Sequence, residues 1–194
     1  MVSKKLSGSE QEAALVKALN GRPIILIGLM GAGKTTIGRR LAKRLSIPFR
    51  DADHEIEAAA NLSVAEIFSQ HGEAHFRDGE KKVIARLLEQ GTHVLATGGG
   101  AWMNEETRST VKGRGVSVWL KAEFDILMER VRRRSHRPLL QDPDPEGVMH
   151  RLIDERYPVY AEADLTVMSR DVPHEAIVGA VVDALEDYVK ANPS

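Results

Sequence analysis

The segment at residues 28–35 holds the residues whose types and spacing are best suited to chemistry. It reads Gly28-Leu29-Met30-Gly31-Ala32-Gly33-Lys34-Thr35, which matches the pattern G-x-x-x-x-G-K-[ST]. The glycines let backbone N–H groups converge on phosphate oxygens, and the positive end of a following helix adds to that attraction. Lys34 can reach the β- and γ-phosphates, and the Thr35 hydroxyl can hold Mg²⁺. The segment therefore predicts a site for a nucleoside triphosphate that the protein uses.

The residues on either side of this loop favour the same interpretation over a chance glycine-rich turn. An apolar run at 24–27 precedes it, and apolar residues at helical spacing follow it at Ile37, Leu41 and Leu45. A buried strand, a tight loop and a helix start are the context that the pattern requires.

Two carboxylates follow the next predicted strand at a spacing of two, at Asp51 and Asp53. On an extended strand end, residues i and i+2 point to the same side, so both carboxylates are expected to face the triphosphate site. Carboxylates there can hold Mg²⁺ or its waters and can orient an attacking hydroxyl. The alternative roles of these aspartates are a turn and a helix cap, where Asp is common.

A run of three glycines, Gly98-Gly99-Gly100, ends the third predicted strand after Thr97. Three consecutive glycines are costly in chain entropy, and they let a ligand approach the backbone closely. A flexible turn is the alternative. Arg77 and Arg156 lie in helical stretches, where most arginines form solvated ion pairs, so neither is informative by itself.

A dense basic run follows the fourth predicted strand, at Arg130, Arg132, Arg133, Arg134, His136 and Arg137. We expect a mobile lid at about 131–145 that brings arginines over phosphates, where they stabilise the charge of the transferred group. A solvated basic face is the alternative. A nucleic-acid surface would be accompanied by interleaved aromatics and an overall basic charge, and the sequence has neither.

The elements that must position these residues alternate between strands and helices. Strands are expected at 24–27, 47–51, 93–96, 116–120 and 165–168. Helices are expected at about 34–45, 53–60, 63–71, 73–90, 105–112, 124–133, 146–160 and 173–190. Alternation of this kind predicts an α/β fold of three αβα layers around a central five-stranded parallel sheet. Ligands bind such sheets at the carboxyl ends of the strands, where residues 28–35, 51–53 and 97–100 should gather.

The first 22 residues are expected to form an N-terminal arm, and residues 23–194 a single domain. Residues 1–8 have a composition typical of disorder, and Ser9 with Glu12 has the pattern of a capping box that starts a short helix. Gly21 should end this helix before Pro23 opens the first strand. The helix either packs on the domain surface or serves as an oligomer contact or regulatory arm.

Composition excludes several classes of site. The 194 residues carry a net charge of −1 and no cysteine, so disulfides, thiolate metal sites and cysteine nucleophiles are excluded. The charge gives no basis for binding nucleic acid or an anionic membrane, and no apolar run approaches the roughly 20 residues of a membrane span. The start of the sequence lacks the pattern of a secretory signal. We expect a cytoplasmic monomer.

Taken together and in this order, these motifs resemble those of the shikimate kinases, a family of the nucleoside monophosphate kinase-like P-loop group. The resemblance covers about residues 23–190. The matching pieces are the loop at 28–35, Asp51-Ala52-Asp53, Phe76-Arg77, Gly98-Gly99-Gly100, Arg137-Pro138-Leu139-Leu140 and Arg156-Tyr157-Pro158-Val159-Tyr160.

The resemblance implies ATP-dependent phosphorylation of the 3-hydroxyl of shikimate, which gives 3-phosphoshikimate and ADP in aromatic amino-acid biosynthesis. Asp53 would contact the substrate hydroxyls, either as a base or by orienting the hydroxyl that reacts. Arg77 and Arg156 would hold the shikimate carboxylate, and the turn Gly98–Gly100 would enclose the ring. The region at about 52–90 would bind shikimate.

The same resemblance implies the nucleotide contacts. Mg²⁺ would be held by Thr35 directly and by Asp51 through water. Lys34 and the lid residue Arg137 would contact the phosphates, and Arg130 would stack near the adenine beside the turn at 171–173. The expected nucleotide-binding residues are Gly31, Ala32, Gly33, Lys34, Thr35, Thr36, Arg130 and Arg137.

The loop ends in Lys34-Thr35-Thr36 where many relatives have serine after the lysine, but the hydroxyl needed for the metal is retained.

Three other functions are consistent with a phosphate loop. A gluconate kinase is disfavoured by the combination of Asp51, Asp53, Arg77 and three glycines. A GTP-dependent switch would carry an Asn-Lys-x-Asp motif, which does not occur in this sequence. A non-catalytic regulator would not need Lys34, Thr35, Asp51, Asp53 and Arg137 intact.

Overall fold

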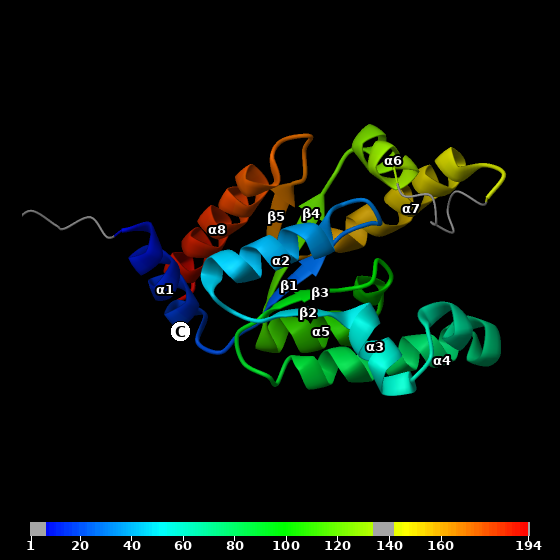
Figure 1. Ribbon diagram of the computed structural model, residues 1–194, viewed down its shortest axis with the longest axis horizontal. Helices are drawn as coiled ribbons and strands as arrows, with labels where there is room; N and C mark the ends of the chain where they lie inside the picture. Colours follow the sequence, from blue (N-terminus) through cyan, green and yellow to red (C-terminus); the bar gives the residue numbers. More distant parts are fainter. Residues whose placement is uncertain (1–6, 134–141, 194) are drawn as a thin grey trace, which may run out of the picture.

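Five parallel strands form the centre of the computed structural model, which describes residues 7–133 and 142–193. The strand order is β2-β3-β1-β4-β5 (Figure 1). The strands are β1 (Ile24–Ile27), β2 (Phe49–Asp51), β3 (Val94–Ala96), β4 (Val116–Lys121) and β5 (Leu165–Met168). All pairings are parallel, which confirms the predicted five-stranded α/β fold.

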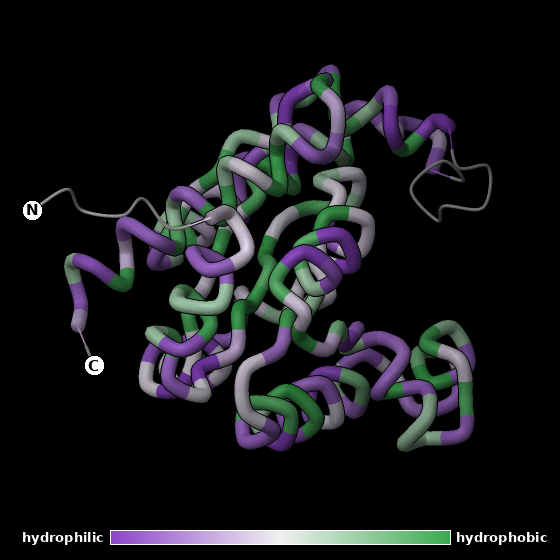
Figure 2. Tube along the Cα trace, turned by 60° about the vertical axis from the view of Figure 1, so that its left-hand side comes forward, coloured by the Kyte–Doolittle hydropathy of each residue, from purple (hydrophilic) through white to green (hydrophobic). Residues whose placement is uncertain are grey.

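The three central strands β1, β3 and β4 are buried because their side chains are largely apolar on both faces of the sheet. Every residue of β1 is buried, and Ile24 pairs with Val94 on one side and Val116 on the other. Figure 2 shows hydrophobic residues gathered along the central strands, while hydrophilic residues alternate along the surrounding helices. The core therefore runs through the sheet, and the loops at the strand ends are left to carry polar side chains.

Helices cover the sheet as crossover connections between parallel strands. They are α1 (Gly8–Leu19), α2 (Lys34–Leu45), α3 (Ala52–Ala60), α4 (Val64–Leu87), α5 (Glu105–Arg114), α6 (Phe124–Arg132), α7 (Pro145–Tyr160) and α8 (His174–Ala191), with a short 3₁₀ helix, η1 (Ala101–Met103). Helices α1, α2 and α8 pack against one another, and α4 packs against α5 and η1 (Figure 1). Among the residues described, no helix combines the length and the apolarity that a membrane span needs.

Helix α4 contains a sharp break at Gly72, where φ is 79° and ψ is 171°. Only glycine adopts such a conformation without strain. Two helices were expected here, at 63–71 and 73–90. The backbone break at Gly72 agrees with that division, although the two segments run on as a single element.

The N-terminal helix begins two residues earlier than the predicted capping box. The N-cap is Ser7, whose side chain accepts from the Glu10 N–H, while the Glu10 carboxylate accepts from the Ser7 N–H at 2.7 Å. The expectation of a cap at Ser9 was therefore wrong, because Ser9 already lies within the first turn. Glu12, its supposed partner, instead pairs with Arg44 of α2 at 2.7 Å. This contact helps to hold α1 on the domain.

Candidate active site

The predicted site segments meet at one edge of the sheet because parallel strands all end there. The loop at 28–33 follows β1, Asp51 ends β2, and the glycine run 98–100 follows β3. Since β1 and β2 both pair with β3, these three strand ends are neighbours. The sheet therefore gathers the groups that the sequence analysis singled out.

The phosphate loop has the backbone that its glycines predict. Gly31 and Gly33 adopt φ values of 84° and 94°, in the left-handed region that side chains disfavour. Gly33 is also the N-cap of α2, and it offers no side chain to the amide groups of the first turn. Those N–H groups are thus left to bind an anion at the positive end of the helix. Lys34 donates to the carbonyls of Gly28 at 2.7 Å and Leu29 at 3.1 Å.

Thr35 and Asp51 form a pair of oxygen donors beside this loop. The Thr35 hydroxyl donates to Oδ2 of Asp51 at 3.1 Å. A hydroxyl and a carboxylate are ligands that suit Mg²⁺, a hard cation that is usually held by one or two protein groups, substrate phosphates and water. The donor set therefore fits the metal that the loop motif implies.

Asp53 does not have the extended strand-end geometry that was expected from its spacing to Asp51. Strand β2 stops at Asp51, and Asp53 lies in the first turn of α3, where its N–H donates to Oδ1 of Asp51 at 3.2 Å. Asp51 is thus both the N-cap of α3 and the partner of Thr35. The geometric reason given for pairing the two carboxylates was wrong, although the start of the helix still keeps them adjacent.

The Asp53 carboxylate is poised to accept a proton more readily than an ordinary aspartate. Removal of water around it raises its pKa, the negative charge of Asp51 raises it further, and Lys34 opposes the shift. Asp53 still exposes a large part of its surface, so water screens a part of these interactions. A raised pKa beside a phosphate loop suits a group that binds or deprotonates a hydroxyl.

Each glycine of the run 98–100 faces a charged side chain. A Cβ on Gly98 would lie 3.2 Å from Oδ1 of Asp53, and one on Gly99 would lie 3.2 Å from Nη1 of Arg156. A Cβ on Gly100 would lie 2.6 Å from Cζ of Arg77. The absence of side chains here is what lets these three groups approach the turn. The glycines therefore form the wall of a charged recess, and the structure brings Asp53, Arg77 and Arg156 together as predicted.

Glu80 is a member of this recess that the sequence analysis did not select. It is 3% exposed, accepts from Arg77 at 2.8 Å, and its Oε1 lies 2.8 Å from the Cβ position of Gly98. Burial raises the pKa of Glu80, and Arg77 opposes that shift. In the described part of the chain, Oε1 of Glu80 and Nε of Arg156 are buried without a hydrogen-bond partner, so the recess retains unused polar atoms.

Tyr160 is a second group that sequence reasoning missed. Its hydroxyl donates to the carbonyl of Gly99 and also hydrogen-bonds Arg156. One residue earlier, the carbonyl of Val159 accepts from Nε1 of Trp102 at 3.2 Å. These contacts fasten the end of α7, which carries Arg156, to the glycine turn.

A separate cavity of about 360 Å³ lies against the phosphate loop, within the size range of small-molecule sites. Its walls come from the phosphate loop, α6 and the turn between β5 and α8. They are formed by Met30, Gly31, Gly33, Lys34, Thr35, Thr36, Ile37, Arg130, Val131, Arg133, Ser169, Asp171, Val172, His174 and Ile177. The predicted nucleotide residues in this set adjoin Ser169 and His174, which were not predicted.

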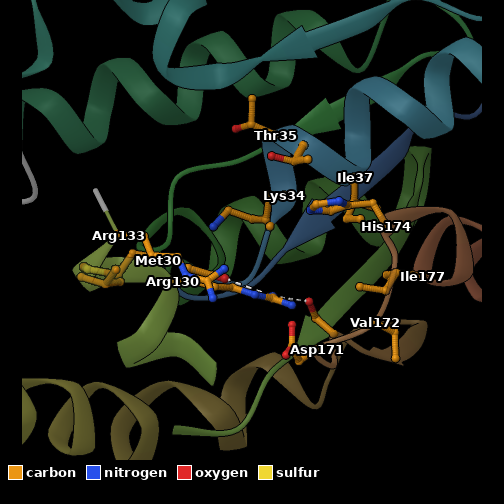
Figure 3. A pocket seen from close by; sticks show the side chains of 15 residues that line it. Met30, Lys34, Thr35, Ile37, Arg130, Arg133, Asp171, Val172, His174 and Ile177 are labelled. Atoms are coloured by element: carbon orange, nitrogen blue, oxygen red, sulfur yellow. Dashed lines mark hydrogen bonds between the residues drawn. The ribbon is translucent and has the colours of Figure 1, made fainter. Parts of the chain in front are cut away.

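Arg130 lies along the wall of this cavity. It donates to the carbonyl of Gly31 at 3.3 Å, to Oγ of Ser169 at 2.8 Å and to the carbonyl of Arg170 at 2.6 Å. Figure 3 shows its side chain reaching toward the turn that carries Asp171 and Val172. Arg130 and this turn thus border one cavity, as the sequence analysis expected.

The lid residue Arg137 lies outside the described residues, as do Arg134 and His136 of the basic run. The flanking elements are described: α6 ends at Arg132 and α7 begins at Pro145. The predicted lid at 131–145 therefore joins two helices that pack against each other. The role of Arg137 stays a prediction.

Comparison with known proteins connects these features to one family. The model of the shikimate kinase family matches residues 30–186. The shikimate kinase of Rhodopseudomonas palustris is 61% identical over 185 residues, which are 95% of this chain and 91% of that protein. The shikimate kinase of Bradyrhizobium diazoefficiens is 59% identical, over 92% of this chain and 86% of that protein.

Solved structures agree with the sequence comparison. A shikimate kinase from Acinetobacter baumannii in complex with shikimate superposes with a TM-score of 0.82 at 36% identity, covering 89% of this chain and 98% of that chain. A gluconokinase from Sinorhizobium meliloti superposes with a TM-score of only 0.62 at 16% identity, over 88% of this chain and 95% of that one. The second likeness establishes a common fold alone.

Proposed function

The chain belongs to the shikimate kinase family, and from that premise we propose which of its residues transfer the γ-phosphoryl group of ATP to shikimate. The reaction phosphorylates the 3-hydroxyl and gives 3-phosphoshikimate and ADP, a step in aromatic amino-acid biosynthesis. The assignments below name the group that carries out each part of it.

The nucleotide occupies the phosphate loop and the adjoining cavity. Amide groups at Gly31, Ala32 and Gly33 surround the phosphates, and Lys34 leaves its loop carbonyls to contact the β- and γ-phosphates. The Thr36 side chain stands beside them at the start of α2. Arg130 borders the adenine with the turn at 171–173, and Arg137 contributes from the lid. These assignments are supported by the cavity that the loop, α6 and the β5–α8 turn enclose.

Thr35 and Asp51 would hold Mg²⁺, Thr35 through its hydroxyl and Asp51 through water. When bound there, the metal neutralises charge on the β- and γ-phosphates. The support for this assignment is the 3.1 Å distance between the Thr35 hydroxyl and the Asp51 carboxylate, the two oxygen ligands proposed for the metal.

Shikimate occupies the recess at the glycine turn. A small polyhydroxylated carboxylate needs a bidentate arginine for its acid and a carboxylate for its hydroxyls. Arg77 and Arg156 provide the first, Asp53 provides the second, and the turn Gly98–Gly100 closes over the ring. Glu80 orients Arg77 by accepting a hydrogen bond of 2.8 Å from its guanidinium.

The chemical step is an in-line displacement. The 3-hydroxyl oxygen attacks the γ-phosphorus, the bond from that phosphorus to the β–γ bridging oxygen breaks, and ADP leaves with the electron pair. The hydroxyl proton passes to the Asp53 carboxylate, whose raised pKa favours accepting it. Lys34 and Arg137 stabilise the charge on the transferred group, so positioning and electrostatics carry most of the rate.

One observation carries this proposal: the charged recess adjoins the phosphate loop directly. The Cβ position of Gly99 lies 3.2 Å from Arg156 and 3.6 Å from the carbonyl of Gly28, the first residue of the loop motif. An acceptor held by the arginines would therefore lie next to the phosphates. Lid closure would then exclude water and suppress hydrolysis of ATP.

At the level of the whole chain, we propose a cytoplasmic monomer whose partners are ATP and shikimate, with no nucleic-acid or membrane partner. Residues 23–194 would form one domain after an N-terminal arm at 1–22. Within it, the region at about 52–90 would bind shikimate, and the segment at about 131–145 would act as the lid.

A crossed binding experiment tests the residue assignments. Calorimetric titrations with ATP and with shikimate, each alone, would be made on Lys34→Ala, Arg77→Ala and the control Arg86→Ala. Arg86 lies on the same helix as Arg77, and its guanidinium forms an exposed ion pair with Glu55.

Lys34→Ala should bind shikimate normally and lose on the order of 10³-fold in turnover. Arg77→Ala should lose about 2–5 kcal/mol of shikimate binding free energy, as expected for a buried charged hydrogen bond, with ATP binding nearly unchanged. Arg86→Ala should resemble the wild type. An equal loss of both ligands in Arg77→Ala would contradict the assignment.

A further inference from the structure

A serine that is distant in the sequence forms a hydrogen bond with the backbone of the phosphate loop. Ser169 follows β5, and its hydroxyl donates to the carbonyl of Ala32 at 2.8 Å. The same oxygen accepts from Nη1 of Arg130 at 2.8 Å. Ser169 therefore joins the loop to α6 through one hydroxyl group.

Ser169 is held firmly enough to act as a fixed donor. Ser169 is 1% exposed. Its backbone N–H donates to the carbonyl of Lys121, on the neighbouring strand β4, at 2.7 Å. The sheet therefore fixes the position of the hydroxyl. Arg130 orients it by donating to it, which leaves the hydroxyl proton for the Ala32 carbonyl.

The contact determines which way one peptide group of the loop points. In a planar trans peptide, the carbonyl of Ala32 and the N–H of Gly33 point in opposite directions. Holding the carbonyl against Ser169 therefore keeps the Gly33 N–H pointing away from Ser169, available for the phosphate contact assigned to Gly33. Gly33 has a φ of 94° and tolerates either sign of φ, so its own backbone does not lock this peptide. An external donor is needed to do so.

We propose that Ser169 is a positioning residue of the nucleotide site. Its hydroxyl keeps the Ala32–Gly33 peptide oriented for phosphate binding, and it holds the Arg130 guanidinium along the cavity wall. Ser169 lies in the wall of the cavity, and its effect on the nucleotide is assigned to the two groups that its hydroxyl contacts, the Ala32 carbonyl and Arg130. This inference rests on the proposal that ATP binds the loop at 28–35.

The experiment compares Ser169→Ala with Ser169→Thr and with Ser117→Ala. Threonine retains the hydroxyl, whereas alanine leaves the buried Ala32 carbonyl without its donor. Ser117 is a matched control in β4, because it is 0% exposed and its hydroxyl donates to Asp164 at 2.6 Å. Losing that bond affects the fold without touching the phosphate loop.

Ser169→Ala should raise the dissociation constant and the KM for ATP about tenfold, as expected for a lost buried hydrogen bond, and leave shikimate binding without nucleotide unchanged. Ser169→Thr should stay within about threefold of the wild type, and Ser117→Ala should lower thermal stability without weakening ATP binding. If Ser169→Ala does not fold, Ser169→Cys replaces it, because a thiol is a weak donor of similar shape. The cysteine variant should then weaken ATP binding selectively.

Wild-type ATP affinity in a folded Ser169→Ala or Ser169→Cys protein would overturn the inference and leave the proposed function intact. An equal loss of ATP affinity in Ser117→Ala would also overturn it, because the effect would then follow general stability. A wild-type protein that binds no ATP would instead overturn the proposed nucleotide site itself, and the inference with it.

Discussion

The hydroxyl of Thr35 donates to a carboxylate oxygen of Asp51 at 3.1 Å, although 16 positions separate the two residues. Thr35 lies in the first turn of α2, and Asp51 ends the edge strand β2. Strand β3 lies between β2 and β1, so the sheet brings the end of one strand to the loop that follows another. The pair joins the phosphate loop to the segment that carries Asp53.

Asp51→Asn tests the metal role of this pair. Asparagine is as good an N-cap as aspartate, so α3 should keep its cap while the charge is removed. The Mg²⁺ concentration that gives half-maximal ATP binding should rise about 10- to 100-fold, the range seen when groups that support a metal are altered. Calorimetry of ATP binding over a series of Mg²⁺ concentrations measures this, and an unchanged Mg²⁺ dependence would exclude the role.

Gly100→Ala tests the placement of Arg77. The backbone of Gly100 is right-handed, with φ −89° and ψ −17°, so alanine adds no backbone strain there. Its Cβ would lie within 2.6 Å of Cζ of Arg77 and push the guanidinium aside. The KM for shikimate should rise at least about tenfold while the KM for ATP stays near the wild-type value.

The matched control is Gly79→Ala on α4, where a new Cβ meets nothing within 4 Å. Removing this glycine from the helix should stabilise the protein by about 0.5–1 kcal/mol and leave both KM values alone. A Gly100→Ala enzyme with a normal KM for shikimate would show that Arg77 does not hold the acceptor.

Tyr160→Phe tests how α7 is fastened to the glycine turn. The change removes the hydroxyl that donates to the Gly99 carbonyl, so the free energy of unfolding should fall by about 1–3 kcal/mol. Because the hydroxyl also contacts Arg156, the KM for shikimate should rise. Tyr157→Phe is the control, since its hydroxyl donates to the carbonyl of Ala122, away from the turn. Denaturant unfolding and initial rates separate the outcomes, and equal KM values in the two variants would refute the prediction.

Glu57→Gln tests whether Asp53 must be ionised. Loss of hydration raises the pKa of Asp53, the charge of Asp51 adds to this, and Glu57 raises it further. Turnover should therefore fall at the acid end of the pH range, at a higher pH than an ordinary aspartate would give. Glutamine removes one negative neighbour, which favours ionisation of Asp53 and moves the acid limb of kcat/KM to lower pH.

The amide oxygen of the introduced glutamine can still accept from the Val64 N–H, as the Glu57 carboxylate does at 3.0 Å. Glu55→Gln is the control on the same helix, because Glu55 is not among the groups that shift the Asp53 pKa. Glu80 also has a raised pKa, but burial and the charge of Asp53 raise it, and Glu57 does not. An acid limb that does not move in Glu57→Gln would point to Glu80 or another group.

The sheet and the phosphate loop were predictable because their signals are local. Continuous apolar runs marked the strands, and the pattern from Gly28 to Thr35 needs no distant residue to be recognised. The carboxyl-edge rule then placed Asp51 and the glycine run beside the loop. For Asp53 the predicted proximity to Asp51 was confirmed, but the reason given for it was wrong, because Asp53 lies in the first turn of α3 and not on an extended strand end.

The residues that were missed depend on contacts between distant segments. Glu80 lies three positions after Arg77 on a helix, which in sequence looks like an ordinary surface pair. Its burial arises only when the helix packs beside the turn after β3. Tyr160 and Gly99 are 61 positions apart, and Ser169 and Ala32 are 137 apart, so no periodicity or short motif can reveal these hydrogen bonds.

The most direct test of the account is a coupled assay of ADP release with Mg·ATP and shikimate, gluconate or no acceptor. The arrangement of Asp53, Arg77 and Arg156 predicts rapid ADP release when shikimate is the acceptor, but not with gluconate or without an acceptor. One 3-phosphoshikimate, identified by mass, should form for each ADP released. Release that depends on gluconate, or that needs no acceptor in a folded protein with ATP bound, would contradict the assignment of the acceptor recess.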